Sequence, residues 1–345
     1  MSTIPIYIVH LDAPTARDKW KQIATEYKTF IHTCYQETQK RILQNVPEWF
    51  LSRIYKYIEH LARKPNTMVL YVDELSVFAD ICNVPLGAMI LMQVCYELYA
   101  CCTSAVLSGT ADVGPLHFRT LDWGMKGLNQ LTVQIEFRQN NKTVYSAITW
   151  AGFVGHLTVM KPGVGSISLN YRATPNGRLM HNLWRLWYGY YPAGYWIRDV
   201  IERCKSYKEI VQQLSNRPLI APCYFVVSGT RNGEGCRLIR DRQGVAAVCS
   251  LDDSAKAVIQ TNIDCVKTSK VDISDSKSRH QCAQTQLRHL CVKSIDKVNE
   301  DLLKRFMVAP IVNDTTIFGC VMNARHGVLL AKGIDVSPPP PDSTR

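Results

Sequence analysis

The chain has 345 residues, of which 46% are hydrophobic and 20% charged, the balance of an ordinary folded protein. The formal net charge of +11 suits nucleic acid or an anionic membrane surface, but Lys and Arg are scattered and no nucleic-acid motif accompanies them. We therefore expect no nucleic-acid partner, and no stretch is long and apolar enough to cross a bilayer.

The 13 cysteines are an odd number, so complete internal pairing is excluded, and the absence of Cys-x-x-Cys argues against a zinc site. We expect no metal and no cofactor. The first residues lack the pattern of a signal peptide. Two N-glycosylation sequons begin at Asn141 and Asn313. The Pro-rich tail, 337–345, is expected to be extended or disordered.

Residues 1–101 are predicted to form a helical segment. Thr15 to Asp18 resembles a capping box, and apolar residues spaced three or four apart follow it as far as residue 34. Pro47 begins a second helix of this kind. A third covers about 73–82, and a fourth, 86–98, is apolar over most of its surface and should be buried.

The pattern changes to strands after residue 102. Residues 131–138 alternate between apolar and polar side chains, and 143–150 are predicted to pair with them as a hairpin. Further strands are predicted at 166–171, 223–228, 236–240, 245–249, 257–261, 315–322 and 327–332, with helices at 194–214 and 296–307. Helices that flank two runs of mostly antiparallel strands predict an α+β sandwich of packed layers.

A thiol lies at the junction of the two halves. The sequence there reads Ala100-Cys101-Cys102-Thr103-Ser104, so a buried helix ends and a strand begins with a cysteine. Two strands joined by a Gly-rich turn at 108–114 would return Arg119 and Asp122 to the side of Cys102.

These residue types suit nucleophilic catalysis. A thiol needs a base or a positive neighbour to favour its thiolate, and Arg119 supplies fixed positive charge. If Cys102 were the first residue of a chain, its own α-amine would be the base, and Asp122 would hold the ammonium. The residues alone leave open that Cys102 is only a small buried core residue.

Cys102-Thr-Ser followed by Arg119-x-x-Asp122 resembles the acid ceramidase and N-acylethanolamine acid amidase family. The likeness is collinear over about residues 5–325 and is stronger to the ceramidase branch. It includes the stretches at 83–87, 131–144, 151–155, 161–170, 233–242, 260–262 and 310–316.

The resemblance implies an N-terminal-nucleophile hydrolase αββα sandwich. An inactive precursor would cut itself between Cys101 and Cys102 into a helical α chain, 1–101, and a β chain whose hydrolase domain is 102–336. The two products would stay together as a heterodimer. The substrate would be a lipid amide at a membrane or micelle surface, N-acylsphingosine or N-acylethanolamine, and the compartment would be the lysosome.

The resemblance also implies roles for single residues. Cys102 would be nucleophile and base and would carry the acyl group as a thioester. Arg119 and Asp122 would orient it, and Asn313 would help to form the oxyanion hole. The substrate would contact three further residues, Trp123, Phe153 and Tyr171.

Departures from the family pattern keep alternatives open. Thr120 replaces an Asn, Tyr171 stands where the family has a glutamate of the catalytic and self-cleavage centre, and the late Asp-Asp-Arg-Arg is reduced to Asp275-Ser-Lys-Ser-Arg279. The main alternative is a catalytically impaired, lipid-binding or scaffold protein.

Other assignments of the site residues stay open. They are Cys101 as nucleophile, a Cys–His pair with His117 or His156, and aromatic residues 184–191 as core or as an acyl pocket.

Overall fold

The computed structural model describes residues 1–44, 46–63, 71–94, 101–125, 127–173, 181–182, 184–185, 188–252, 256–264, 275–288 and 295–336. The predicted tail at 337–345 lies outside these residues, and so does the end of the helix predicted at 86–98. The domain division at residue 101 stays a prediction.

Two β-sheets form the centre of the molecule. The eight-stranded sheet has the order β1-β4-β5-β6-β7-β8-β9-β10, and the five-stranded sheet has the order β11-β2-β3-β12-β13. The strands are β1 (Ile6–His10), β2 (Cys101–Leu107), β3 (Leu116–Asp122), β4 (Thr132–Gln139), β5 (Lys142–Trp150), β6 (Thr158–Lys161), β7 (Gly165–Tyr171), β8 (Cys223–Ser228), β9 (Gly235–Arg240), β10 (Val245–Ser250), β11 (Ala257–Gln260), β12 (Thr316–Asn323) and β13 (Val328–Gly333).

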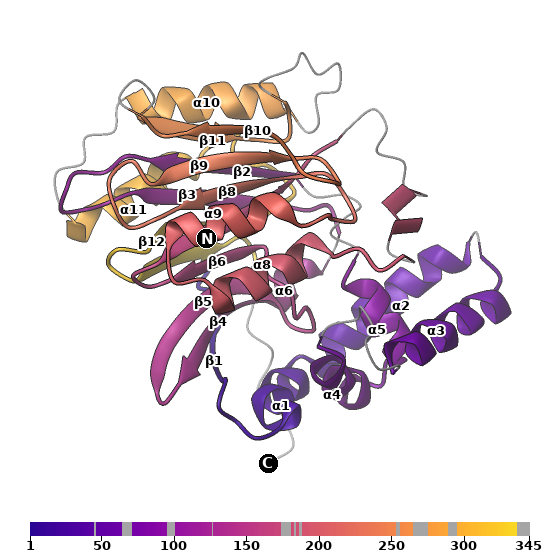
Figure 1. Cartoon of the computed structure of the whole chain (residues 1–345). Helices are drawn as coiled ribbons and strands as arrows, with labels where there is room; N and C mark the ends of the chain where they lie inside the picture. Colours follow the sequence, from indigo (N-terminus) through magenta and orange to yellow (C-terminus); the bar gives the residue numbers. More distant parts are fainter. Residues whose placement is uncertain are drawn as a thin grey trace.

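Helices cover the outer face of each sheet. The helices α8 (Ala193–Arg203) and α9 (Tyr207–Asn216) pack on the eight-stranded sheet, and α10 (Ser276–Arg288) and α11 (Ile295–Phe306) pack on the five-stranded one. The inner faces meet through β2 and β3 on one side and β7 and β8 on the other. The predicted αββα sandwich is therefore confirmed (Figure 1).

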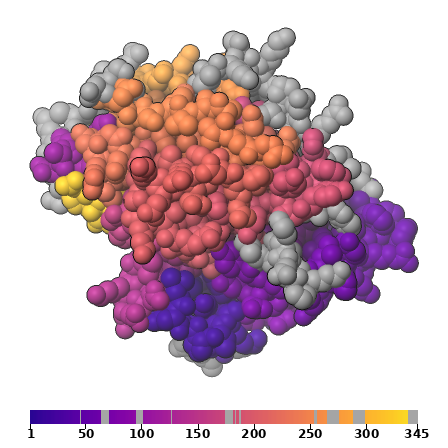
Figure 2. Space-filling model, viewed as in Figure 1, coloured from indigo at the N-terminus to yellow at the C-terminus, as the bar shows by residue number. Residues whose placement is uncertain are grey.

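The N-terminal helices form a cluster beside the sandwich (Figures 1 and 2). They are α1 (Ala16–Glu26), α2 (Lys28–Leu43), α3 (Glu48–Ala62), α4 (Val72–Cys82) and α5 (Leu86–Met92); a short α6 (Leu128–Leu131) follows in the second half. No single helix in the described ranges is long and apolar enough to cross a membrane, although α4 and α5 pass that test together and are bent by 116°.

Local signals explain several of these elements. Thr15 accepts a hydrogen bond from the Asp18 N–H at 3.1 Å and so caps α1, as predicted. Tyr27 divides the first predicted helix into α1 and α2. Asn140 and Asn141 both have positive φ, which suits the two-residue turn between β4 and β5. The single helix expected at 194–214 is divided into α8, which ends at Arg203, and α9, which Ser206 caps.

Four of the described elements were not predicted: β1, β6, α10 and the one-turn helix α6. The strand β1 lies in the segment expected to be helical, and it pairs in parallel with β4. It has only five residues at a sheet edge, and its outward residues Ile6 and Ile8 are exposed and apolar, so the expected polar alternation is missing. The four-residue β6 is also short, and α10 is too polar to show a helical apolar stripe.

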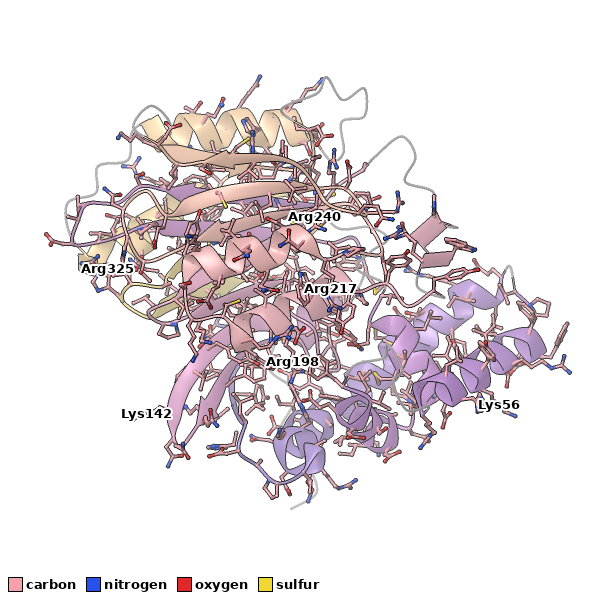
Figure 3. The ribbon with its side chains drawn as sticks, in the orientation of Figure 1. Lys56, Lys142, Arg198, Arg217, Arg240 and Arg325 are labelled. Carbon is pink, nitrogen blue, oxygen red and sulfur yellow. The ribbon has the colours of Figure 1, made fainter. Side chains whose placement is uncertain are left out.

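Basic residues lie at separate parts of the surface. Figure 3 places Lys56 on α3, Lys142 at the tip of the β4–β5 hairpin and Arg325 above Lys142, at the left edge of the sandwich. These three cations do not form one patch. That the chain has no nucleic-acid partner stays a prediction.

Candidate active site

The strand β2, which lies between β11 and β3 in the five-stranded sheet, carries the candidate nucleophile. The strand β2 pairs antiparallel with β3, so that Cys101 lies opposite Asp122 and Ser104 opposite Arg119. Because side chains alternate along a strand, Cys102 and Arg119 face the other sheet, whereas Asp122 faces α10. The predicted return of the second strand beside the first is confirmed, and it brings the Arg119 side chain to Cys102, whereas the Asp122 side chain lies on the opposite face of the sheet.

A buried guanidinium lies against the thiol. The Arg119 Nη2 is 3.2 Å from the Cys102 Sγ and donates to the Leu169 carbonyl at 3.0 Å. Its Nη1 donates to the Leu157 carbonyl and the Thr158 hydroxyl. Both Cys102 and Arg119 are completely buried. The guanidinium is therefore a fixed positive charge in direct contact with the sulfur.

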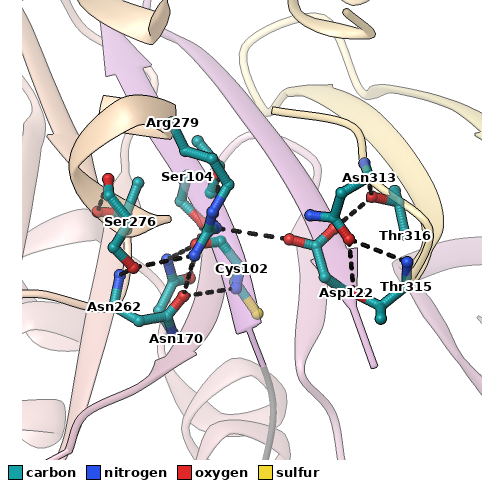
Figure 4. Close-up of polar contacts among 12 residues, drawn as sticks. Cys102, Ser104, Asp122, Asn170, Asn262, Ser276, Arg279, Asn313, Thr315 and Thr316 are labelled. Atoms are coloured by element: carbon teal, nitrogen blue, oxygen red, sulfur yellow. Dashed lines mark hydrogen bonds and ion pairs between the residues drawn. The ribbon is translucent and has the colours of Figure 1, made fainter. Parts of the chain in front are cut away.

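The main chain of Cys102 is held on both sides. Its N–H donates to the Asn262 Oδ1 at 2.9 Å. Its carbonyl accepts from Arg279 Nη1 at 2.8 Å and from Asn170 Nδ2 at 3.4 Å. Figure 4 shows Arg279 between Cys102 and Asp122. If the chain were cut before Cys102, Asn262 would lie beside the new α-amine.

The Asp122 carboxyl is buried among donors. Its Oδ1 accepts from the Thr316 hydroxyl at 2.7 Å, and its Oδ2 is 3.5 Å from Arg279 Nη1. Burial raises the pKa of Asp122 to about 6, against the opposing effects of Arg279, Thr316, Arg119 and a side-chain hydrogen bond with Asn313. A charge held this way can orient a cationic group only above that pH.

Asn313 lies behind Asp122 rather than on the nucleophile's main chain. Its Oδ1 accepts from the Thr315 N–H at 2.9 Å and from the Thr315 hydroxyl at 2.6 Å. The amide oxygen that binds the Cys102 N–H belongs to Asn262. The oxyanion role assigned to Asn313 stays a prediction. Because an oxyanion needs a donor, a second candidate is the Nδ2 of Asn262, which also donates to the Tyr171 carbonyl, and not the Asn262 oxygen.

Besides Asn170, two residues that hold the main chain of Cys102 were assigned no role from the sequence. They are Asn262, just after β11, and Arg279, whose Nη2 also donates to Asn262 Oδ1 at 2.9 Å. Both fell inside stretches compared with the family, Thr261-Asn262 and Asp275 to Arg279. The family likeness of these stretches is the signal that could have found them, although substitutions surround both residues.

An apolar cavity of about 60 Å³ lies on the side of Trp123, and neither Cys102 nor Arg119 lines it. Its walls come from α2, α5 and the second half of the chain, and they include two of the predicted substrate contacts, Trp123 and Phe153. Trp123 follows Asp122 directly and meets Trp150 edge to face at 5.2 Å between centroids. Such apolar walls suit an acyl chain.

Tyr171 lies at a different point from that cavity. It ends β7, and its carbonyl accepts from the Asn262 Nδ2 at 2.9 Å. Its side chain is not among the described residues that line the cavity. The position of the family's glutamate therefore supports Asn262 through the main chain, and a substrate contact by Tyr171 stays a prediction.

The other candidates have other partners. The ring of His117 contacts the Ser166 and Ser168 hydroxyls, and that of His156 contacts the Tyr145 hydroxyl at 3.5 Å. The rings of Trp184 and Tyr188 contact each other at 4.1 Å between centroids, tilted by 44°, and the two residues are 54% and 60% exposed, so the core interpretation is wrong for these two. Among the described residues, no group of His, Cys, Asp or Glu could hold a metal ion.

A buried cysteine near the start of a central strand, in an αββα sandwich, defines the class of N-terminal-nucleophile hydrolases. No protein-family model matches the chain. It is 31% identical to acid ceramidase of Pan troglodytes over 76% of this chain and 70% of that one. It is 29% identical to acid ceramidase of Mus musculus over 94% of this chain and 84% of that one.

A solved structure agrees with these relatives. The Caenorhabditis elegans ortholog of N-acylethanolamine-hydrolyzing acid amidase superposes with a TM-score of 0.55 at 29% identity, over 64% of this chain and 92% of that one. The chain belongs to the acid ceramidase family. It is a hydrolase that acts on amide bonds, and the scaffold alternative is not favoured.

Proposed function

We propose that this protein hydrolyses a lipid amide, N-acylsphingosine or an N-acylethanolamine, to a fatty acid and an amine. The observation that carries the proposal is the Arg119 guanidinium 3.2 Å from the Cys102 thiol, and an apolar cavity lined by Trp123 and Phe153 agrees with it. The names of the relatives, ceramidase and N-acylethanolamine-hydrolyzing amidase, supply the substrate class.

The first reaction is a self-cleavage. The Cys102 sulfur attacks the Cys101 carbonyl carbon, the peptide C–N bond breaks, and the Cys102 nitrogen takes a proton as it becomes an amine. Water then hydrolyses the Cys101 thioester and restores the thiol. Asn262 and Arg279 hold Cys102 on both sides during these steps, which keeps the reacting atoms aligned.

The second reaction acts on the lipid. The freed α-amine takes the thiol proton, and the thiolate, stabilised by Arg119, attacks the amide carbon of the substrate. Amide donors of Asn262 or Asn313 stabilise the tetrahedral oxyanion. The amine product leaves with a proton, and water hydrolyses the thioester to release the fatty acid.

The two products of the cut remain one particle. The strand β1 pairs with β4 across the proposed division, and the buried Arg198 and Glu74 form an ion pair across it at 2.7 Å. Gln93 adds hydrogen bonds to the Gly152 carbonyl and the Val154 N–H at 2.8 and 3.0 Å. These contacts support an α/β heterodimer.

A denaturing gel tests the self-cleavage. Wild-type protein incubated at acid pH should yield fragments 1–101 and 102–345, and Cys102→Ala should yield neither. Cys101→Ala is the matched control and should still be cut. Uncut wild-type protein that binds lipid but hydrolyses none would overturn the proposal.

Substrate and compartment need separate tests. Release of fatty acid from ceramide and from an N-acylethanolamine, each at acid and neutral pH, identifies the amine that the protein accepts. We place the protein in the lysosome, where an acid hydrolase of lipids works. Co-fractionation of the native protein with lysosomal markers supports this compartment, and its exclusion from them contradicts it.

A further inference from the structure

A line of polar side chains crosses the interface between the two sheets. Three of them, Ser166, Ser168 and Asn170, recur at every second position of β7 and therefore lie on one face, toward β2 and β3. The facing strands contribute Ser104 and His117, and β8 contributes Ser228. All six residues are 0% exposed, in a place where sandwich proteins bury apolar side chains.

Each member bonds to the next. The Ser228 and Ser166 hydroxyls are 2.8 Å apart, and Ser166 is 2.8 Å from His117 Nδ1. His117 Nε2 is 2.9 Å from the Ser168 hydroxyl. Ser168 donates to Ser104 at 2.9 Å, and Ser104 donates to Asn170 Oδ1 at 2.8 Å. The line ends where Asn170 Nδ2 reaches the Cys102 carbonyl (Figure 4).

The direction of these bonds is fixed by donor counting. A hydroxyl has one proton, and the proton of Ser104 goes to Asn170 Oδ1, which can only accept. Ser168 must therefore give its own proton to Ser104, and it can only accept from His117. The Nε2 of His117 then carries the ring proton, and Nδ1 accepts from Ser166.

The state of the imidazole agrees with this direction. Burial, helped by the charge of Arg119, lowers the pKa of His117 to about 3. The ring is therefore neutral under all mildly acid conditions, with one donor and one acceptor nitrogen. The donating nitrogen faces Ser168, so a single arrangement satisfies every group of the line.

The amide of Asn170 has one orientation that satisfies both Ser104 and the neighbouring carbonyls. Because Oδ1 accepts from Ser104, Nδ2 points to the Gln260 and Cys102 carbonyls, at 2.9 and 3.4 Å. If the amide turned over, its oxygen would face those two carbonyls. The Cys102 carbonyl would then keep Arg279 as its donor and lose Asn170.

We propose that His117 is a positioning residue for Cys102, acting through Ser168, Ser104 and the amide of Asn170. It touches neither the thiol nor a reacting carbonyl in this line. Its Nε2–H completes the one run of hydroxyl bonds that leaves Asn170 Oδ1 as an acceptor and Nδ2 on the nucleophile's main chain, so the line and the two carbonyls hold Asn170 in the same orientation. The inference rests on the proposed function of Cys102.

The test compares variants that break or keep the direction of the line. His117→Phe keeps a flat ring and removes both nitrogens, and His117→Gln restores an N–H donor near the place of Nε2. We expect His117→Phe to slow self-cleavage and lipid hydrolysis about tenfold, the effect of one misdirected buried hydrogen bond, and His117→Gln to recover most of the rate. Thr132→Val, which removes a buried hydroxyl bonded to the Leu128 carbonyl elsewhere, should leave both rates unchanged.

A double-mutant cycle separates positioning from simple stabilisation. The Ser168→Ala change cuts the same line with little loss of volume, so it also serves if His117→Phe does not fold. Its effect on rate should not add to that of His117→Phe, because the two residues act through one line of bonds. Additive effects, or folded His117→Phe protein that reacts at the wild-type rate, would overturn the proposal.

Nitrogen NMR provides a readout independent of activity. In ¹⁵N-histidine-labelled Cys102→Ala protein at about pH 5, one ring should be neutral with its proton on Nε2, and its signals should disappear in His117→Gln. A protonated ring, or a proton on Nδ1, contradicts the inference. If the ring is as expected while wild-type protein neither cuts itself nor hydrolyses lipid, the line stands and the proposed function is what fails.

Discussion

At the scale of single residues, two asparagines compete for one role. The Asn262 oxygen accepts from the Cys102 N–H, and its donor, Nδ2, is directed to the Tyr171 carbonyl. Asn313 contacts Thr315 and Asp122. Asn262→Ala should lower the rate of lipid hydrolysis by about 10²–10³, the usual cost of losing an oxyanion donor. Asn313→Ala should cost about tenfold or less, because it acts through Asp122. Steady-state kinetics on protein that has already been cut compares the two variants. A larger loss of rate in Asn313→Ala than in Asn262→Ala would assign the oxyanion role to Asn313.

The pKa of Asp122 predicts a pH dependence of stability. Its folded-state pKa of about 6 lies above the usual 3.8, so the folded protein holds the proton more tightly than the unfolded chain does. Between these two values the free energy of unfolding should fall as the pH rises, by about 3 kcal/mol in all. Above about pH 6 the loss is complete.

Urea unfolding of Cys102→Ala protein at several pH values measures this slope. In the double variant Cys102→Ala, Asp122→Asn the contribution of Asp122 disappears, so its curve should be flatter between about pH 4 and pH 6. Parallel curves for the two proteins would show that the carboxyl is not held as the structure indicates.

Sequence patterns found the half of the site that is local. Cys102, Arg119 and Asp122 lie on two adjacent strands joined by one turn, so alternation and a hairpin bring them together. Asn262 and Arg279 come from 160 and 177 residues away and reach Cys102 only through the packing of β11 and α10 on β2. No periodicity reports contacts at such a separation, and only the family likeness pointed to these stretches.

At the scale of elements, the cap of α1 is a prediction confirmed by geometry. Thr15→Ala leaves the Asp18 N–H without its hydroxyl acceptor, which should cost about 1 kcal/mol in the free energy of unfolding. Thr15→Ser keeps the acceptor and serves as the control. Thermal or urea unfolding measures both, and an equal loss in the two variants contradicts a capping role.

Elements with a strong period were predictable, and those without one were not. The strand β4 alternates over most of its length, and the turn at Asn140 and Asn141 starts its pairing with β5, although the register shifts between Arg138 and Phe137. The helix α10 shows no apolar stripe, because its buried residues include Ser276 and Arg279, which serve the site. A function carried by polar side chains thus removes the pattern that would predict the element.

At the scale of the whole molecule, the ion pair of Glu74 and Arg198 joins the two proposed chains. Arg198→Met would leave the Glu74 carboxylate buried without its cation, at a cost of about 3–5 kcal/mol. We expect the cut protein to separate into its chains at lower urea concentrations, as seen by size-exclusion chromatography.

Two controls identify the cause of that loss. Arg203→Met removes an exposed ion pair with Asp199 on the same helix and should change stability by less than about 1 kcal/mol. The double variant Glu74→Gln, Arg198→Met removes the stranded charge and should recover part of the loss. A single variant as stable as Arg203→Met would contradict a joining role.

The parallel pairing of β1 with β4 has a consequence for the lifetime of the cut protein. Before the cut, β1 returns to its place by a search within one chain. If the chain is cut as proposed, β1 and β4 then belong to different molecules, so reassembly would depend on concentration and would compete with aggregation. The mature particle would then persist through the height of its barrier to unfolding rather than through equilibrium. Each molecule would then fold efficiently only before the cut, as the precursor.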